Sequence, residues 1–544
     1  MEIERLRTRE WVVATAAGLV AMFWQLVTFN GFPNDHYVVV ARARQILLGA
    51  WPVRDFVDPG MPLTYVPSAL ARALFGDVVG AEMAVVAVGI GIGAAATAVC
   101  ASKLARWTFI GCAVVLLEVL ASPRSYSYPK MLLYGVAACV IVAVAARGSR
   151  SRILLAAVLA AIAFLVRHDH GLYIGVACAA AISLGAPDVR AAARRLAEFS
   201  VVVAALILPW AVAVQYYAGL VPYFRSAVAF SRREADINVL RDWPSFHGPA
   251  TVSAENAEAW LYYLFFALPL IGVGLAVWRR VAKREQWAGE SAAVVAIALM
   301  ALAVDVGFLR KPLATRLPDA IVPACLLGAW LLGLAWSART RWTVASILAR
   351  GVAASLLVVT AVAVWQVGDV SDKLDAVGVF DDWDHVREHV GDMATVAGRQ
   401  EIDVVRFPSR VSAGLVPFFR YLDRCTVPGD RLFVSGSYPD VFVLGRRGFA
   451  GGHVAFMEAF YSSAEEQSLT LSRMRRESVP FVLLVLDEQA AFARSFPMLL
   501  AHITNAYDAV TDVPIPGMEG VRILVERARV ATGVDQTTGW PCFR

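Results

Sequence analysis

The chain has 544 residues, of which 58% are hydrophobic and only 17% are charged, and its mean hydropathy is +0.58. A composition this apolar excludes a soluble protein folded around one core, and it predicts a polytopic α-helical membrane protein. The formal net charge of +5 is weak evidence for nucleic acid. We attribute it to Lys and Arg residues that anchor cytoplasmic loops, and we expect no nucleic-acid partner.

Apolar runs along the chain predict about eleven transmembrane helices. The first run is long and is followed by the polar stretch NGFPND without a small-residue cleavage site, so we expect a retained helix rather than a signal peptide. The predicted spans are residues 11–29, 78–101, 107–121, 131–146, 153–166, 172–186, 197–217, 259–278, 291–308, 320–337 and 343–367.

Basic residues cluster between alternate spans, and loops rich in Lys and Arg usually face the cytoplasm. With the N-terminus inside and an odd number of spans, the loop after the first span and everything after about residue 368 are predicted to lie outside. The predicted cytoplasmic residues are Lys103, Arg106, Arg147, Arg150, Arg152, Arg190, Arg194, Arg195, Arg279, Arg280, Lys283, Arg284, Arg339 and Arg341.

The character of the chain changes after residue 367. Residues 1–367 are predicted to form the transmembrane domain, and residues 368–544 a C-terminal extracytoplasmic α/β domain with strands in RLFVSG, PFVLLVL and VRILVE. Of the seven cysteines, only Cys425 and Cys542 lie outside the spans, and we predict that they are within bridging distance in an oxidising compartment. No cysteine and histidine spacing indicates a zinc site.

The first outer loop, residues 31–76, contains apolar residues at helical spacing over 37–48 and 63–75, flanked by Pro or Gly. These segments are predicted to be two helices lying along the membrane surface. Asp35 stands at the start of the first, directly after the first span. It is interpreted either as a helix N-cap or as a reactive carboxylate, and the two roles do not exclude each other.

The order of these features resembles a known family. One span from a cytoplasmic N-terminus, a carboxylate at the start of a long outer loop, the segment DPGMPLTYVPSALARALFG, many more spans and an extracytoplasmic C-terminal domain resemble the GT-C glycosyltransferases. The chain is most similar to the branch of bacterial protein O-mannosyltransferases and aminoarabinose transferases. The resemblance implies a location in the bacterial cytoplasmic (inner) membrane.

The resemblance implies transfer of a sugar from a polyprenyl-phosphate donor to a glycan, lipid or protein acceptor outside the membrane, with Asp35 as general base and no separate cofactor. An acceptor hydroxyl is a poor nucleophile at neutral pH, so a carboxylate that takes its proton suits this reaction. Asp55 and Asp58 are the alternative acids of the loop. Asp58 is also a candidate for substrate binding, but it precedes a proline and is more typical of a turn residue.

A phosphate leaving group requires cations, and three clusters at the predicted outer edge provide them. The first is SPRSYSYPKM, with Arg124, Tyr128 and Lys130; the second is RHDHGLY, with Arg167, His168 and His170; the third is LRKPLATRLPD, with Arg310, Lys311 and Arg316. The resemblance implies that a basic residue after the fifth span contacts the donor phosphate, which is the place of RHDHGLY.

Each cluster also has a structural interpretation. RHDHGLY interrupts an apolar stretch, and placing its charged side chains near a bilayer costs free energy unless they have partners. The structural interpretation is an interfacial turn in which Arg167 pairs with Asp169. Tyr126 and Tyr128 stand where relatives often carry a second acid, so we expect no divalent metal, and both tyrosines would suit an aromatic belt. The third cluster would otherwise be a solvated loop.

Two other regions and two rival functions complete the interpretation. The polar loop 218–258 suits a mobile acceptor-binding element, and the C-terminal domain suits acceptor recognition or scaffolding. A transporter or flippase of lipid-linked sugars would share the spans and cations, but its site usually lies at mid-membrane between repeated halves, and we found no repeat. A ligase for a whole lipid-linked glycan is the other rival.

Overall fold

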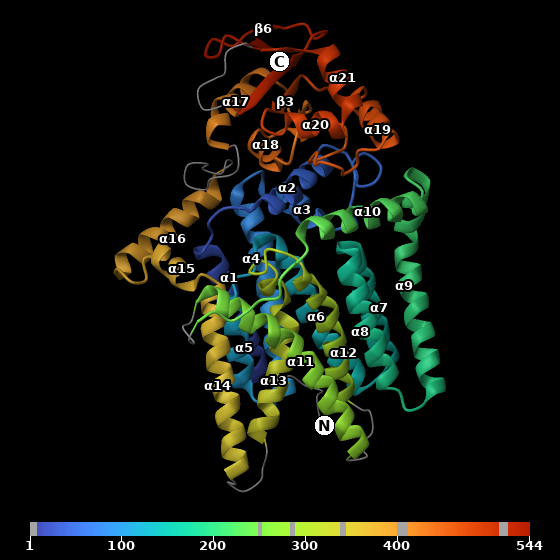
Figure 1. Cartoon of the computed structure of the whole chain (residues 1–544), viewed down its shortest axis with the longest axis vertical. Helices are drawn as coiled ribbons and strands as arrows, with labels where there is room; N and C mark the ends of the chain where they lie inside the picture. The colour runs from blue at the N-terminus through green and yellow to red at the C-terminus, as the bar shows by residue number, and fades with distance from the viewer. Residues whose placement is uncertain (1–7, 249–252, 283–288, 338–343, 400–411, 511–519) are drawn as a thin grey trace. The chain divides into compact units, whose positions relative to one another are not determined.

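A computed structural model describes residues 8–248, 253–282, 289–337, 344–399, 412–510 and 520–544 (Figure 1). The chain forms two compact units. The first consists of Met1–Phe29, Met83–Trp210 and Glu234–Ala394, and the second of Asn30–Glu82, Ala211–Arg233 and Thr395–Arg544. Each unit is therefore assembled from segments that are far apart in the sequence.

The first unit is a helical bundle, and each of the eleven predicted apolar runs falls in a helix of its own. These helices are α1 (Thr8–Val27), α4 (Val79–Ala105), α5 (Thr108–Leu120), α6 (Tyr128–Ala146), α7 (Arg150–Val166), α8 (His168–Leu184), α9 (Val189–Tyr217), α11 (Ala254–Ala282), α12 (Glu290–Asp305), α13 (Leu317–Ser337) and α14 (Val344–Val367). Short helices η1 (Ser125–Ser127), η2 (Val306–Leu309), α15 (Val370–Val377) and α16 (Trp383–Gly398) follow some of them.

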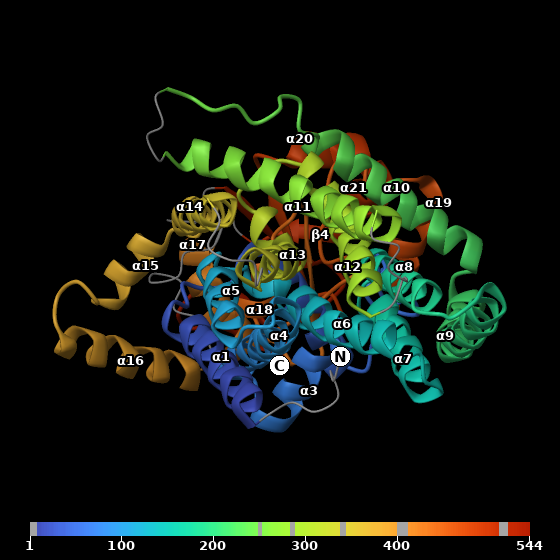
Figure 2. The same ribbon diagram turned by 90° about the horizontal axis from the view of Figure 1, so that it is seen from below.

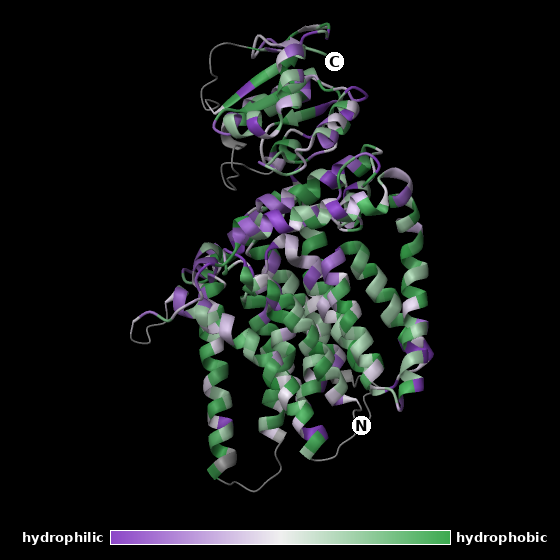
Figure 3. Cartoon of the chain, turned by 45° about the vertical axis from the view of Figure 1, so that its right-hand side comes forward, coloured by the Kyte–Doolittle hydropathy of each residue, from purple (hydrophilic) through white to green (hydrophobic). Residues whose placement is uncertain are grey.

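Length decides how many of these helices could cross a membrane unaided. Among the described residues, eight helical segments are long and apolar enough to do so, whereas α5, α7 and α8 have 13, 17 and 17 residues. Figure 3 shows that the bundle helices are hydrophobic along most of their length. The polytopic helical class predicted from composition is therefore confirmed.

Burial separates central helices from peripheral ones. The apolar segment of α13 is 78% buried, whereas those of α9 and α14 are each 11% buried and stand at the rim of the bundle (Figure 2). In the interior, α4 and α6 touch through glycines: a Cβ on Gly135 would lie 2.5 Å from the carbonyl oxygen of Gly93. Helices in an apolar solvent pack in this way because small residues let the backbones approach closely.

The basic loops gather at one end of the bundle, as their alternation along the chain predicts. Arg106 and Arg279 both pair with Glu290, at 2.6 and 3.4 Å, and the backbone N–H of Gly289 donates to the carbonyl of Ala145. These contacts bring together the loops after α4, α6 and α11. Of the predicted cytoplasmic residues, Lys283, Arg284, Arg339 and Arg341 lie outside the described ranges.

The second unit is built on a five-stranded sheet of order β2-β1-β3-β5-β4. The strands are β1 (Arg431–Val434), β2 (Gly448–Phe449), β3 (Phe481–Val485), β4 (Tyr507–Ala509) and β5 (Val521–Glu526). Strand β1 pairs in parallel with β2 and β3, while β5 runs antiparallel to β3 and β4. The three predicted strands are β1, β3 and β5.

Helices and a small second sheet complete this unit. They are α17 (Ser412–Cys425), α18 (Pro439–Leu444), α19 (Ala464–Met474), α20 (Gln489–Ser495) and α21 (Pro497–Ala506), with β6 (Gly533–Val534) paired to β7 (Pro541–Cys542). Cys425 and Cys542 form a disulfide with Cα atoms 4.4 Å apart, which confirms their predicted proximity.

The first loop contains the two predicted helices, α2 (Asn34–Leu47) and α3 (Val66–Phe75), and they belong to the same unit as the C-terminal sheet; their predicted position along the membrane surface stays a prediction. The amide of Gln45 in α2 donates to the carbonyl of Phe449 in β2 at 2.6 Å. The first loop and the C-terminal α/β region therefore pack together within the second unit.

The segment 218–258, expected to be a mobile loop, is a helix over much of its length. Helix α10 (Leu220–Asn238) has 19 residues, with Val221 and Ile237 strongly exposed. The sequence LVPYFRSAVAFSRREADIN places apolar residues at helical spacing between polar ones. This spacing indicates a helix, and the prediction of a loop overlooked it.

Candidate functional site

Asp35 lies inside the first turn of α2, six residues after the first span begins to unwind at Thr28–Phe29. The helix begins at Asn34, and the capping position is Pro33, which has no side chain able to accept a hydrogen bond. The interpretation of Asp35 as the N-cap is therefore wrong, because the N-cap lies two residues earlier, at Pro33. The proline ring fixes φ at a value that suits the start of a helix. The Asp35 side chain is exposed, and it has no hydrogen-bond or ion-pair partner within the described residues.

The neighbouring residue, His36, fixes the start of α2. Its Nε2–H donates to Glu82 Oε1 at 2.8 Å, and both side chains are completely buried. Glu82 also accepts a hydrogen bond from Ser68 of α3 at 2.9 Å, and the His36 ring stacks on Phe32 at 4.4 Å. This network holds the first turn of α2 rigidly and turns Asp35 to the opposite, solvent-facing side.

Asp58, the alternative acid, is a structural residue in this unit. It is only 5% exposed and accepts hydrogen bonds from the backbone of Met61 at 2.9 Å, Tyr65 at 3.1 Å and Tyr223 at 3.0 Å. The Met61 contact is the expected turn bond. Burial, followed by the Asp58 carboxylate, raises the pKa of the Tyr223 hydroxyl, which therefore remains a donor that ties α10 to the first loop.

Asp55 is also engaged locally. Its Oδ2 accepts from the backbone N–H of Trp51 at 2.8 Å and from Arg54 Nε at 2.7 Å. Of the three acids considered in the first loop, Asp35 is thus the one whose carboxylate is both exposed and unengaged among the described residues. This distinction follows from the fold and could not be read from the order of the acids in the sequence.

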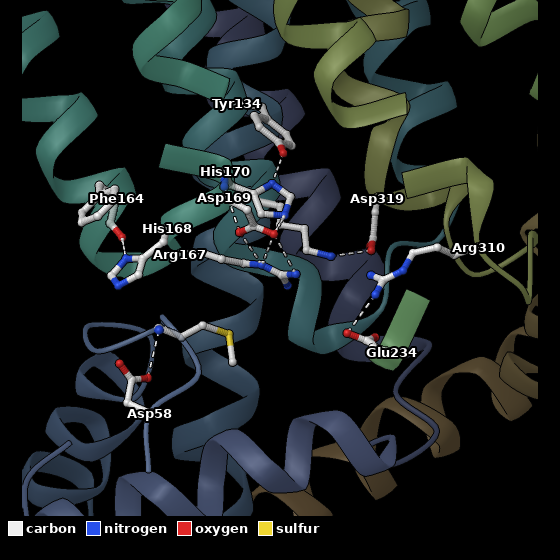
Figure 4. Close-up of polar contacts among 12 residues, drawn as sticks. Asp58, Tyr134, Phe164, Arg167, His168, Asp169, His170, Glu234, Arg310 and Asp319 are labelled. Atoms are coloured by element: carbon white, nitrogen blue, oxygen red, sulfur yellow. Dashed lines mark hydrogen bonds and ion pairs between the residues drawn. The ribbon is translucent and has the colours of Figure 1, made fainter. Parts of the chain in front are cut away.

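In the first unit, charged side chains cluster where α6, α8 and α13 begin (Figure 4). Lys130, in the first turn of α6, pairs with Asp319 in the first turn of α13 at 2.5 Å. Both are 7% exposed, and Ser127 donates a further hydrogen bond to Asp319. We call Lys130, Asp319, Arg167, Asp169 and His170 the ion cluster.

Arg167 occupies the one-residue break between α7 and α8. Its guanidinium donates to Asp169 from Nε at 2.9 and 3.2 Å and from Nη2 at 3.2 Å (Figure 4). The predicted pairing of Arg167 with Asp169 is therefore present. Within the described residues, the Nη1 group has no hydrogen-bond partner, so the Arg167–Asp169 pairing does not use its two N–H donors.

The two histidines of RHDHGLY point in different directions. His170 is hydrogen-bonded through Nδ1 to Tyr134 of α6, and its backbone N–H donates to Asp169 at 2.9 Å, so it belongs to the ion cluster. His168 donates from Nδ1 to the carbonyl of Phe164 at 2.7 Å and stacks on the Phe164 ring at 4.2 Å. His168 is thus turned away from the cluster (Figure 4).

The break between α7 and α8 depends on Gly171. A Cβ at this position would lie 2.1 Å from the Phe164 Cα and 2.2 Å from its nitrogen, so only glycine lets the two helices approach this closely. The close approach sets Arg167, Asp169 and His170 at the bundle end. Sequence reasoning did not single out this glycine.

The remaining predicted cations differ in their surroundings. Arg310 pairs with Glu234 at 2.9 Å, and Lys311 is exposed. Arg316 carries a buried Nε for which the described residues provide no hydrogen-bond partner. Arg124 is exposed. Among the described residues, no acid pairs with Arg316, Lys311 or Arg124, so these three residues add positive charge at this bundle end.

Tyr128 does not lie open to a ligand. It is 4% exposed, and its ring packs against α4, where a Cβ on Gly89 would meet the ring at 2.5 Å. Tyr126 lies beside Lys130, whose Nζ is 5.6 Å from the ring centroid. Tyr128 thus packs between α4 and α6. This buried position differs from both predicted roles, which were contact with the sugar donor and a place in an aromatic belt at the membrane interface.

Two buried acids near the same bundle end were not foreseen. Glu118 is fully buried near the end of α5 and faces Thr97, and Asp305 is 2% exposed at the end of α12. Both acids lie inside apolar runs that were predicted as spans from their mean hydropathy. A single acid hardly changes that mean, so neither residue was singled out, although an acid within a span often has a function. Among the described residues, no group of three His, Cys, Asp or Glu side chains is arranged to hold a metal ion.

Comparison with known proteins gives little further information. No protein-family model matches the chain, and no curated protein matches it. Among solved structures, the crystal structure of ArnT from Cupriavidus metallidurans bound to undecaprenyl phosphate is similar, with 15% sequence identity, a TM-score of 0.48, and coverage of 96% of this chain and 99% of that one. A similarity this low does not transfer chemistry from one protein to the other.

Proposed function

We propose that the protein is a GT-C-type membrane glycosyltransferase that moves a sugar from a polyprenyl-phosphate donor to an acceptor hydroxyl on the side of the membrane where the first loop lies. The observation that carries the proposal is Asp35: an exposed, unengaged carboxylate held on a rigid helix directly after the first span. Such a group is placed to accept a proton beside a lipid-anchored substrate.

The proposed reaction is a single displacement. Asp35 accepts the proton of the acceptor hydroxyl, the acceptor oxygen forms a bond to the anomeric carbon, and the bond from that carbon to the phosphate oxygen breaks. The polyprenyl phosphate leaves with the bonding electron pair, and the configuration at the anomeric carbon inverts. Electrostatic stabilisation of the negative charge that develops on the leaving group is usually a large term in such reactions.

The cations of the first unit are proposed to supply that stabilisation. Arg167 offers its Nη1 donors, and Arg316 and Lys311 offer charge that the described residues leave uncompensated. Lys130 and His170 hold the ion cluster in position through Asp319 and Asp169. Charge-assisted hydrogen bonds to phosphate are about twice as strong as neutral ones, which favours arginine in this role.

The proposed setting is the bacterial cytoplasmic membrane, with the N-terminus in the cytoplasm. The donor is the lipid-linked sugar itself, and a divalent metal is not expected. The acceptor, a glycan, a lipid or a protein, is proposed to be recognised partly by the C-terminal α/β region, which packs on the first loop through the Gln45–Phe449 hydrogen bond.

The test is an assay on the purified full-length chain in liposomes. Polyprenyl-phosphate sugars labelled in the sugar are added together with cell-envelope fractions as acceptors. We expect one labelled donor to lose its sugar to an acceptor while the lipid phosphate is released. Passage of the intact labelled donor across the bilayer without transfer would instead identify a transporter or flippase.

A further inference from the structure

A cavity lies at the end of the bundle that carries the basic loops. Its volume is about 440 Å³, and it is lined by residues of α1, α4, α6 and α7. Along α6, the lining begins at Cys139, about 13 Å from Lys130 of the ion cluster, and ends at Arg147, about 25 Å from it, at 1.5 Å per residue. The proposed reaction uses no residue of this cavity.

The cavity arises from small side chains on two facing helix stripes. On α4 the lining residues include Ile92, Ala95, Ala96 and Val99, which have the i, i+3, i+4, i+7 spacing of one helix face. The Gly93–Gly135 contact holds α4 and α6 together one turn away, and beyond it the alanines leave space between them. Ile92 is 49% exposed, so this face reaches the lipid side of the bundle.

The facing stripe on α6 has the same character. Cys139, Val142, Ala143 and Ala146 line the cavity, again at the spacing of one helix face. Trp11 of α1 lies at the rim and is 59% exposed, as is usual for tryptophan at a membrane interface. The cavity is therefore an apolar groove between helices.

Three cations close the groove at its basic end: Lys103 at the end of α4, Arg147 directly after α6 and Arg152 in the first turn of α7. Arg152 is held in place because its Nη1 donates to the Ala143 carbonyl at 2.9 Å. Lys103 has no hydrogen-bond or ion-pair partner within the described residues. Glu10 precedes Trp11, but it does not line the cavity.

We propose that this groove binds an anionic phospholipid, with its phosphate on Lys103, Arg147 and Arg152 and an acyl chain along the α4 and α6 stripes. The phosphate of such a lipid would meet the Lys103 ammonium, which has no partner within the described residues, and its acyl chain would fill the apolar groove, which a free anion would leave empty. Basic pockets between spans on the cytoplasmic side are suited to anionic head groups, each Lys or Arg adding an attraction that strengthens binding about fivefold.

The first experiment measures lipid binding by native mass spectrometry on the purified full chain. Phosphatidylglycerol is compared with phosphatidylcholine of the same acyl chains, for the wild type, Lys103→Gln, Arg152→Gln and the matched control Arg190→Gln. Arg190, in the first turn of α9, is an exposed cation that does not line the cavity. We expect tighter binding of phosphatidylglycerol, weakened about fivefold by Lys103→Gln and Arg152→Gln but not by Arg190→Gln.

The second experiment uses native cysteines of the wild-type chain and needs no variant. Cys139 lines the groove, whereas Cys112 of α5 is exposed and lies outside it. We expect phosphatidylglycerol to slow the labelling of Cys139 by an apolar maleimide while labelling of Cys112 is unchanged.

Three results would overturn the proposal. If phosphatidylglycerol protected Cys139 and Cys112 equally, or if Arg190→Gln lost as much binding as Lys103→Gln and Arg152→Gln, the lipid would bind around the whole protein and not in the groove. Equal binding of phosphatidylcholine would remove the role of the cations. Displacement of phosphatidylglycerol by polyprenyl phosphate at much lower concentration would assign the groove to the lipid carrier instead.

Discussion

His36 and Glu82 form a completely buried hydrogen-bonded pair, Nε2 to Oε1 at 2.8 Å, although 46 positions separate them in the sequence. The pair joins the start of α2 to the start of α4 and leaves Asp35 facing outward. The geometry of the proposed base therefore depends on two residues that take no part in the chemistry.

The Glu82→Ala variant removes the partner of His36. Breaking a buried pair costs about 3–5 kcal/mol, so we expect a clearly lower midpoint of thermal unfolding in detergent and a loose first turn of α2. The matched control is Asp55→Ala, an acid whose bonds are local, for which a change within about 0.5 kcal/mol is expected. An unaltered midpoint in Glu82→Ala would show that the pair does not anchor the helix.

Arg167 and Asp169 allow the phosphate role of the arginine to be separated from its structural role. If Nη1 binds the donor phosphate, Arg167→Ala weakens donor binding by about 1.5–3 kcal/mol, whereas Asp169→Asn, which keeps the arginine, does not weaken it. The double variant Arg167→Ala/Asp169→Asn removes the unpaired acid and isolates the folding cost. Equal donor affinity in Arg167→Ala and the wild type, measured by titration, would discard this role.

The disulfide Cys425–Cys542 joins the end of α17 to β7 across 117 positions. Removing a native disulfide that closes a loop of this size typically costs about 2–5 kcal/mol. We expect Cys425→Ser/Cys542→Ser to lower the stability of the C-terminal α/β region to denaturant by this amount, with Cys112→Ser, an exposed free cysteine, as the control. Identical denaturation curves would show that the bridge is dispensable.

His453 predicts how the stability of the second unit depends on pH. Burial, with Arg473 and Arg42 nearby, lowers the pKa of His453 from 6.5 to about 3. Below about pH 6.5 the unfolded chain binds a proton that the folded chain does not, so the free energy of unfolding decreases as the pH falls from 6.5 towards 3.

The His453→Phe variant tests this dependence. Phe456 and Tyr461 lie 5.4 and 5.3 Å from the His453 ring, so an aromatic replacement preserves the packing. Denaturant unfolding at pH 7 and pH 5 should show a smaller loss of stability in the variant, by up to about 1.4 kcal/mol per pH unit. The same loss in both proteins would mean that His453 is already protonated when folded.

Periodicity along the sequence predicted the elements well because each apolar run carries its own signal. All eleven runs lie in helices, the surface segments 37–48 and 63–75 became α2 and α3, and the three apolar strand segments became β1, β3 and β5. The signal failed where apolar and polar residues alternate without a long run, as in α10. Periodicity identifies an element by its own residues, so it works without knowledge of the neighbours.

The partners of the candidate residues could not be predicted in the same way. Lys130 and Asp319 are 189 positions apart, and Tyr223 and Asp58 are 165 apart. Which acid neutralises which cation is decided by how the helices pack, and the pattern of one helix does not contain that information. The sequence therefore named Asp35 among three acids, but only the fold shows that the other two are engaged.

The most direct test of the central claim is the transfer rate of Asp35→Asn with a saturating polyprenyl-phosphate donor. Asparagine keeps the shape of the side chain but removes the basic carboxylate, so we predict a loss of at least ~100-fold while donor binding and membrane insertion stay nearly intact. Asp55→Asn and Asp58→Asn, measured beside it, should retain transfer in proportion to the folded protein. Near-normal turnover in Asp35→Asn, with transfer abolished in Asp55→Asn or Asp58→Asn, would contradict the assignment of Asp35 as the base. Near-normal activity in all three variants would contradict the proposal that the protein is a glycosyltransferase.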